Sequence, residues 1–282
     1  HTQEIHLEYG GVVPELASQE HLNEIIDVVD AALKEAELKL NQLDSIAVTY
    51  GPGLMGSLLV GVNFVKAMSI SLEIPFLGVN HLEGHLFSNY IENKNVTFPN
   101  ICLLVSGGHT QIWLIKDYST FSLIGETTDD AAGEAFDKGA RILGLNYPGG
   151  PEIDKISRNG DIEYVNFPRP KVKKSIYSFS FSGLKTSLLY YSQKLNKDQL
   201  QNNISNIAAS YQEAILDCLF NALKNLTNDY PEVKDIYISG GVAANNRLRE
   251  KSKSFESKYN KNIILPKLEY CTDNAAMIAM AG

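Results

Sequence analysis

Residues 101–115 read ICLLVSGGHTQIWLI, two apolar runs joined by a turn that contains adjacent glycines. Each run has the length of a buried strand, and Gly107-Gly108 favours a tight hairpin turn between them. Outward from this hairpin, predicted strands and helices alternate along the chain, which indicates the α/β class. Further glycine-rich turns follow predicted strands at residues 51–53 and 240–241.

The remaining elements follow from apolar periodicity and from glycine and proline breaks. Strands are expected at 45–50, 75–80, 121–127, 235–239 and 262–266, and helices at 14–33, 54–72, from 81, 129–145, 183–194, 197–226, 243–255 and from 273. Residues 146–175 are rich in Gly, Pro, Lys and Asp and are predicted to form a loop. We expect two lobes, residues 1–95 and 96–282, with the last helix returning to the first lobe.

Composition limits the class of protein. The 282 residues, 44% of them hydrophobic, suffice for one large domain or two packed lobes. The net charge of -8 argues against a protein that binds nucleic acid alone. The three cysteines are widely spaced, which indicates reduced thiols rather than disulfides. No uninterrupted apolar run reaches the length of a membrane span. The first residues lack the pattern of a signal peptide. A cytoplasmic protein without a membrane partner is expected.

The sharpest chemical signal is His81-Leu-Glu-Gly-His85. Histidines at i and i+4 share one helical face, so two imidazoles can hold one metal ion, although such a pair is also found on solvated or packed faces. A third ligand is needed, and Asp273 before the last helix is the best candidate, with helix capping as its alternative role. Glu83 lies two residues after His81 and points away from the metal face, which argues against a zinc peptidase.

Two glycine turns are candidate phosphate sites. Val105 to Thr110 places adjacent glycine amides beside hydroxyl groups, which suits phosphate, or else forms a hairpin without a ligand. The stretch DIYISGGVAANNRLR, residues 235–249, ends a strand in glycines and opens a helix. It is a plausible nucleotide seat with Asn245 facing ribose or base, or an ordinary turn.

Looser candidates surround these turns. Asp137, the turn at Pro148–Gly150 and Asp154 could accept hydrogen bonds from sugar hydroxyls, although Asp137 could equally lie on a solvated face. Residues 179–187 read as a structural strand-to-helix turn with a buried aromatic pair. A basic cluster could follow a tRNA backbone or simply be solvated. Its members are Lys155, Arg158, Arg169, Lys171, Lys173, Lys174 and Lys185.

Together these motifs resemble one family. YGGVVPELAS, GPGLMGSLLVG, HLEGH, LLVSGGHT, GEAFDKGAR, PGGPEID, SFSGLKT, SGGVAANNRLR and CTDNAA occur in the order seen in tRNA N6-adenosine threonylcarbamoyltransferases of the bacterial TsaD type. The resemblance covers essentially the whole chain. It implies a two-lobed, actin-like (ASKHA, ribonuclease H-like) fold with a central nucleotide and metal cleft. Relatives normally begin with a strand absent here, so the N-terminal strands are expected to be missing.

The resemblance also implies site residues, a cofactor and partners. Metal ligands fall on His81, His85 and Asp273, with iron(II) the expected ion and zinc the second candidate. The expected substrate is threonylcarbamoyl-AMP, with tRNA as acceptor. The residues expected to bind threonylcarbamoyl-AMP are Leu104, Val105, Ser106, Gly107, Gly108, Asp137, Gly150, Asp154 and Asn245. A shorter actin-like paralogue (TsaB type) and a small ATPase (TsaE type) are expected partners.

The paralogue is expected on an apolar patch shared by the helices near 15–38 and 54–72, with Leu58 or Val60 exposed. No residue is an evident general base. Three alternatives stay open from the residues alone: a metallopeptidase, a non-catalytic actin-like scaffold subunit, and an ATP-driven kinase of the same superfamily.

Overall fold

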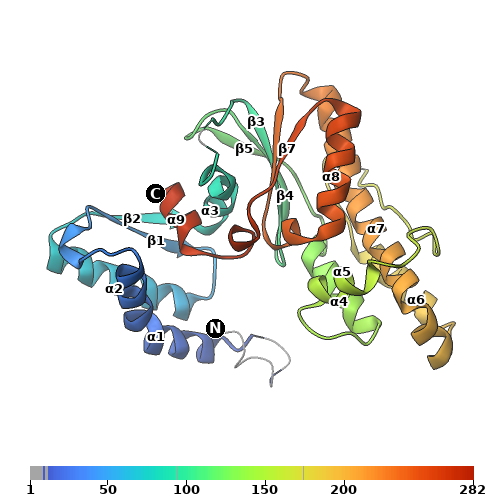
Figure 1. Cartoon of the computed structure of the whole chain (residues 1–282), viewed down its shortest axis with the longest axis horizontal. Helices are drawn as coiled ribbons and strands as arrows, with labels where there is room; N and C mark the ends of the chain where they lie inside the picture. Colours follow the sequence, from blue (N-terminus) through green and yellow to red (C-terminus); the bar gives the residue numbers. More distant parts are fainter. Residues whose placement is uncertain (1–8, 10–11, 94, 174) are drawn as a thin grey trace. The chain divides into compact units, whose positions relative to one another are not determined.

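The computed structural model describes Tyr9 and residues 12–93, 95–173 and 175–282. The chain forms two compact units (Figure 1). The first runs to Ile91 and takes in Asn274–Gly282, and the second spans Glu92–Asp273. Gly10 and Gly11 of the first motif, and Lys174 of the basic cluster, lie outside the described residues.

The first unit is built on two parallel strands joined by a helix. β1 (Ile46–Gly51) pairs with β2 (Phe76–Asn80), and α2 (Met55–Leu72) connects them. α1 (Pro14–Glu35) begins at a proline, as the sequence predicts, and packs along α2. The approach of the two helices depends on Gly56, because a Cβ there would lie 2.8 Å from the Cβ of Ser18.

α3 (His81–Phe87) and α9 (Ala275–Ala281) complete the first unit and pack against each other. Their contact is close at Gly84, where a Cβ would lie 2.8 Å from the Cδ1 of Ile278. Val79, Met277 and Ile278 form a small apolar cluster beside this contact. The C-terminal helix is thereby held against the helix that carries the paired histidines.

α2 has a composition that departs from the rest of the first unit. It is the one helix in the described ranges that is long and apolar enough, at 18 residues, to cross a membrane by length and composition alone. It nevertheless carries Asn63 and Lys66, and it contacts α1, β1 and β2. Val65 is its buried residue. Most of its apolar side chains are therefore half-buried or exposed.

The second unit is a five-stranded mixed sheet with the order β5-β4-β3-β6-β7. The strands are β3 (Asn100–Val105), β4 (Thr110–Ile115), β5 (Phe121–Glu126), β6 (Asp235–Ser239) and β7 (Asn262–Ile264). β3, β4 and β5 form an antiparallel meander, whereas β6 and β7 run parallel to β3. The predicted hairpin around Gly107-Gly108 is confirmed.

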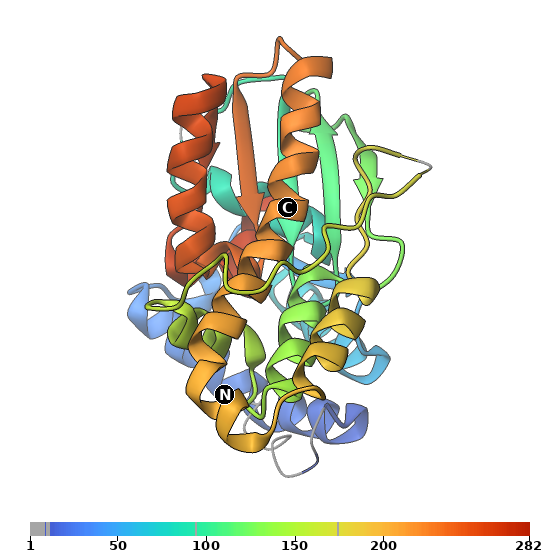
Figure 2. The ribbon, with the colours of Figure 1, turned by 90° about the vertical axis from the view of Figure 1, so that its right-hand side faces the viewer.

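Helices surround this sheet and bury its central strands. They are α4 (Ala132–Ile142), α5 (Gly149–Ser157), α6 (Ser182–Ser192), α7 (Lys197–Asp229) and α8 (Asn246–Tyr259). Figure 2 shows α7, in orange, running alongside α8, in red-orange. β3 is buried along its whole length, as its unbroken apolar run predicts. Short 3-10 turns lie at Leu40–Gln42, Ser88–Tyr90, Gly241–Ala244 and Leu268–Tyr270.

The predicted loop at 146–175 is wrong in part, because α5 occupies Gly149–Ser157. Glycine and proline usually mark loops, but here Pro148 is the N-cap and the Asp137 carboxylate accepts the Gly149 N–H at 2.8 Å. Gly149 is also required by packing, because a Cβ there would lie 2.6 Å from the Cβ of Ala140 on α4. A tertiary hydrogen bond therefore starts a helix that local composition argues against.

Candidate functional site

Two glycine turns leave the same edge of the sheet in the second unit. β3 and β6 are parallel neighbours, with Leu104 opposite Ser239 in register, so their carboxyl ends lie side by side. Gly240 has φ of 91°, and a Cβ there would lie 2.7 Å from the Val105 carbonyl carbon. Only glycine tolerates that conformation and that approach. The two turns therefore lie next to each other at the carboxyl ends of β3 and β6.

The turn after β3 is closed by its own backbone. Ser106 N–H donates to the His109 carbonyl at 2.8 Å, and His109 N–H donates to Ser106 Oγ at 3.1 Å. No described atom lies within 4 Å of the position that a Cβ would take at Gly107 or Gly108. That side of the turn is open to a ligand. Leu104 and Val105 are fully buried, so they can offer a ligand backbone groups only.

Asp137 holds the next turn in place. Its carboxylate on α4 accepts the Gly149 N–H, and Gly150 follows in the first turn of α5. Burial raises the pKa of the Asp137 carboxyl, against hydrogen bonds from the Gly149 and Gly150 amides that lower it. The solvated-face alternative for Asp137 therefore does not hold.

Asn245 and Asp154 both support the start of α8. Asn245 is the N-cap, and its Oδ1 accepts the Leu248 N–H at 2.9 Å while its Nδ2 donates to Gln212 Oε1 at 2.7 Å. Asp154 on α5 accepts two hydrogen bonds from Asn246, one from the backbone N–H at 3.1 Å and one from Nδ2 at 2.6 Å. Asn246 is exposed, whereas Asn245 is buried.

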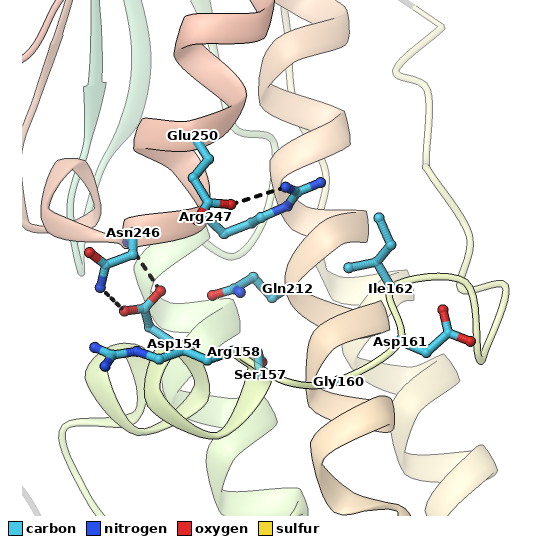
Figure 3. A pocket seen from close by; sticks show the side chains of 10 residues that line it. All are labelled: Asp154, Ser157, Arg158, Gly160, Asp161, Ile162, Gln212, Asn246, Arg247 and Glu250. Carbon is cyan, nitrogen blue, oxygen red and sulfur yellow. Dashed lines mark hydrogen bonds and ion pairs between the residues drawn. The ribbon is translucent and has the colours of Figure 1, made fainter.

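A cavity of about 680 Å³ opens beside these groups (Figure 3). It lies between α5, α7 and α8, within the size range of small-molecule sites. Its lining residues are Asp154, Ser157, Arg158, Gly160, Asp161, Ile162, Gln212, Asn246, Arg247 and Glu250. Of these, Asp154 is the residue expected from the sequence to bind the donor, and Arg158 belongs to the predicted basic cluster. Gln212 and Ser157 could not be predicted as site residues, because neither belongs to a recognisable sequence motif.

A network of charges adjoins this cavity through Arg247, which lines it. Glu213 on α7 pairs with Arg247 at 2.8 Å and with Lys251, both on α8. Lys251 also pairs with Asp217 at 2.7 Å, and Asp217 in turn pairs with Arg169 at 2.8 Å. Burial raises the pKa of the Glu213 carboxyl, but the hydrogen bonds and charges of its two partners outweigh burial and lower the pKa overall.

Ion pairs divide the basic cluster into neutralised and exposed members. Arg169 is held by Asp217, and Lys185 pairs with Asp130 at 3.4 Å, so these two cations already neutralise acidic groups. The exposed members in the described ranges are Lys155, Arg158, Lys171 and Lys173. The predicted aromatic pair of the neighbouring segment is confirmed, because Phe179 and Phe181 are buried and stacked with ring centroids 6.2 Å apart.

The predicted metal ligands come together around α3. The ligand atoms of His81, His85 and Asp273 all lie within 4.8 Å of one another. The two imidazole rings meet edge to face with centroids 4.8 Å apart, and His85 is buried. Asp273 lies two residues before the first residue of α9, and α9 packs against α3, the helix that carries both histidines.

The capping role considered for Asp273 belongs to its neighbour. Asn274 is the N-cap of α9, and its side chain accepts the Met277 N–H at 2.9 Å. Asp273 itself is exposed and directly precedes this cap. Two imidazoles and one carboxylate suit iron(II) with open coordination positions, and also zinc. The residues therefore fit a divalent metal ion.

Known proteins match this chain along its whole length. The sequence profile of the tRNA N6-adenosine threonylcarbamoyltransferase family matches residues 1–280. The chain belongs to that family. The enzyme of that name from Thermosipho africanus is 52% identical over 99% of this chain and 84% of its own length. The one from Kosmotoga olearia is 50% identical over 99% and 82%, respectively.

Solved structures support the fold independently of close sequence similarity. HypF from T. kodakarensis aligns with a TM-score of 0.66 at 15% identity, covering 92% of this chain and 42% of that protein. Full-length HypF in a phosphate- and nucleotide-bound form aligns with a TM-score of 0.61 at 13% identity, covering 92% and 48%. The α/β fold of the actin-like class is thus shown for this threonylcarbamoyltransferase family member.

Proposed function

We propose that this chain transfers the threonylcarbamoyl group from threonylcarbamoyl-AMP to the exocyclic amine of the adenosine next to the anticodon, in tRNAs reading codons that start with A. Family membership over residues 1–280 carries the proposal. The glycine turns and the His-His-Asp group support it, because they suit an adenylate and a metal ion. The family match favours neither a peptidase nor a scaffold, and Glu83 stays misplaced for peptide hydrolysis.

The donor's phosphate is proposed to bind at the turn after β3. Backbone amides of Gly107 and Gly108 would offset its negative charge, beside the Ser106 hydroxyl. The nucleoside would extend toward Asp154 and the cavity between α5, α7 and α8, passing Gly150. Asp137 would act by holding the Gly149–Gly150 backbone, since its carboxylate is already bonded to it.

The metal ion would be held by His81, His85 and Asp273. Iron(II) is the proposed ion, and it would supply Lewis acidity or orient the phosphate or carboxylate of the donor. Because the ligands come from the short helix α3 and the residue before α9, their spacing depends on the packing of those two helices.

The reaction exchanges one acyl bond for another. The adenosine N6 forms a bond to the carbamoyl carbon, and the bond from that carbon to the phosphate oxygen breaks. AMP leaves with the electron pair, and N6 gives up one proton to solvent. Since the amine is a weak nucleophile, positioning of the two substrates would supply most of the acceleration.

tRNA is proposed to contact the exposed cations Lys155, Arg158, Lys171 and Lys173. Arg169 and Lys185 are left out, because acidic side chains already neutralise them. A TsaB-type paralogue and a TsaE-type ATPase are proposed to complete a cytoplasmic assembly, and the partners would add positive surface that this acidic chain lacks.

The paralogue is proposed to cover the exposed apolar side chains of α1 and α2. Leu58 and Val60 are half-buried, whereas Leu59 between them is 52% exposed, and Leu22 and Ile26 are exposed on α1. Leu59→Asp should abolish co-purification with the paralogue. The control Leu189→Asp changes an exposed leucine of the second unit and should have no effect. Retained binding by Leu59→Asp would place the interface elsewhere.

A transfer assay tests the activity. The chain, reconstituted with iron, its paralogue and the ATPase, is incubated with ATP, threonylcarbamoyl-AMP and a tRNA transcript, and modified adenosine is measured by mass spectrometry. We expect modification that disappears in His85→Ala together with bound metal, while the circular dichroism spectrum is unchanged. Absence of modification by the metal-loaded assembly would refute the proposed activity.

A further inference from the structure

Gln212 occupies an unusual place in the wall of the cavity. It lies in the middle of α7, it is only 4% exposed, and it lines the cavity together with Asp154 on α5 and Asn246 on α8 (Figure 3). A buried amide normally has hydrogen-bond partners for both its oxygen and its nitrogen. Which end of this amide faces the cavity therefore decides what the cavity can bind.

The orientation of the Gln212 amide follows from its neighbours. The Leu248 backbone N–H can only donate, so the atom of Asn245 that accepts it at 2.9 Å is the oxygen. The nitrogen of Asn245 then faces Gln212 at 2.7 Å and must donate, which makes its partner the Gln212 oxygen. Gln212 Nε2 is left over. Within the described ranges of the chain, no hydrogen bond engages it.

Ser157 adds a second polar group without a partner. Its side chain is buried at 6% exposure, it lines the same cavity, and its Oγ has no hydrogen-bond partner among the described residues. A buried polar group left without a partner costs about 1–3 kcal/mol. Ser157 Oγ is such a group, and Gln212 Nε2, which no described hydrogen bond engages, belongs to a residue that lines the same cavity; together they point to a polar ligand.

We propose that Gln212 Nε2 donates a hydrogen bond to a ring nitrogen of the adenine of the donor nucleotide, with Ser157 beside it. The inference rests on the proposed function, which places the nucleoside in this cavity. Adenine suits a fixed donor because its N1, N3 and N7 are all acceptors, so each edge of the base offers one. Asn245 is a positioning residue in this arrangement, because it orients the Gln212 amide.

The test combines protein variants with altered nucleotides. Dissociation constants are measured by calorimetry for AMP and for 1-deaza-, 3-deaza- and 7-deaza-AMP, each of which lacks one ring acceptor. Gln212→Glu keeps an oxygen for Asn245 but replaces the donor by an acceptor, and we expect about 10-fold weaker AMP binding. The deaza analogue that lacks the contacted nitrogen should bind the wild type and Gln212→Glu equally.

Controls separate the contact from general damage. Gln201→Glu makes the same change on an exposed position of α7 and should leave all four constants unchanged. Gln212→Met removes the donor without adding charge, and it should show the same selective pattern. An equal loss for all four nucleotides, or no loss for AMP, would overturn the inference. A wild type that fails to bind AMP would refute the proposed nucleotide site itself.

Discussion

Replacing Gly240 by alanine tests whether the two glycine turns depend on each other. Gly240 has φ of 91° and ψ of 169°, a region that only glycine enters readily, and forcing another residue there costs about 1–3 kcal/mol. The new Cβ would also lie 2.7 Å from the Val105 carbonyl carbon, and such overpacking costs a further 1–3 kcal/mol or so. Together we expect a loss of about 4 kcal/mol in the free energy of unfolding.

The assay is urea unfolding followed by tryptophan fluorescence. The chain has one tryptophan, Trp113 on β4, so the signal reports the second unit alone. Gly241→Ala is the matched control, because no described atom lies within 4 Å of its Cβ position and its φ is ordinary. It should change stability by less than about 0.5 kcal/mol. Equal stability of the two variants would refute the reasoning from the Val105 contact.

Three further predictions follow from charges, burial and close packing. Because the pKa of Glu213 is lowered in the folded state, the carboxylate contributes stability above its unfolded pKa of about 4.3 and loses it as pH falls through the folded value. Glu213→Gln should therefore lower the free energy of unfolding at pH 7 and flatten the acid side of a stability–pH curve. Burial raises the pKa of Cys102 and of Cys218 to about 12, so neither thiol should react with iodoacetamide at pH 8 until urea is added. Alkylation of either cysteine in the native protein, detected by mass spectrometry, would contradict this. Gly84→Leu should push α3 away from Ile278 and release most of the metal, measured by elemental analysis after dialysis, although no ligand is changed; full metal retention would contradict it.

Much of the fold was predictable because its signals are local. The apolar run of β3, the glycine pair that follows it and the histidine spacing in α3 each fit within about six residues. α5 escaped prediction because its start depends on a hydrogen bond that the Gly149 N–H donates to the Asp137 carboxylate, twelve positions away. The position of Asp273 shows the same limit, since the sequence places it at the cap and the structure gives the cap to Asn274.

The site residues divide in the same way. Ser106 to Gly108 could be proposed from their types alone, because adjacent glycines and a hydroxyl have few other uses at the end of a strand. Gln212 could not, since a lone amide within a 33-residue helix carries no local pattern. Its importance arises only when α7 brings it against the first turn of α8.

Asn245 shows why an expected binding residue needs the geometry before its role is assigned. Its oxygen is used by the Leu248 N–H and its nitrogen donates to Gln212, so the side chain is occupied by the fold. Asn245→Ala would remove a helix cap worth about 1 kcal/mol. It would also remove the hydrogen bond that orients the Gln212 amide, whose oxygen and nitrogen could then exchange places by rotation. Weaker nucleotide binding in that variant therefore does not demonstrate a direct contact. The selective response of Gln212→Glu to the deaza nucleotides separates reading of the base from support of the helix that presents it.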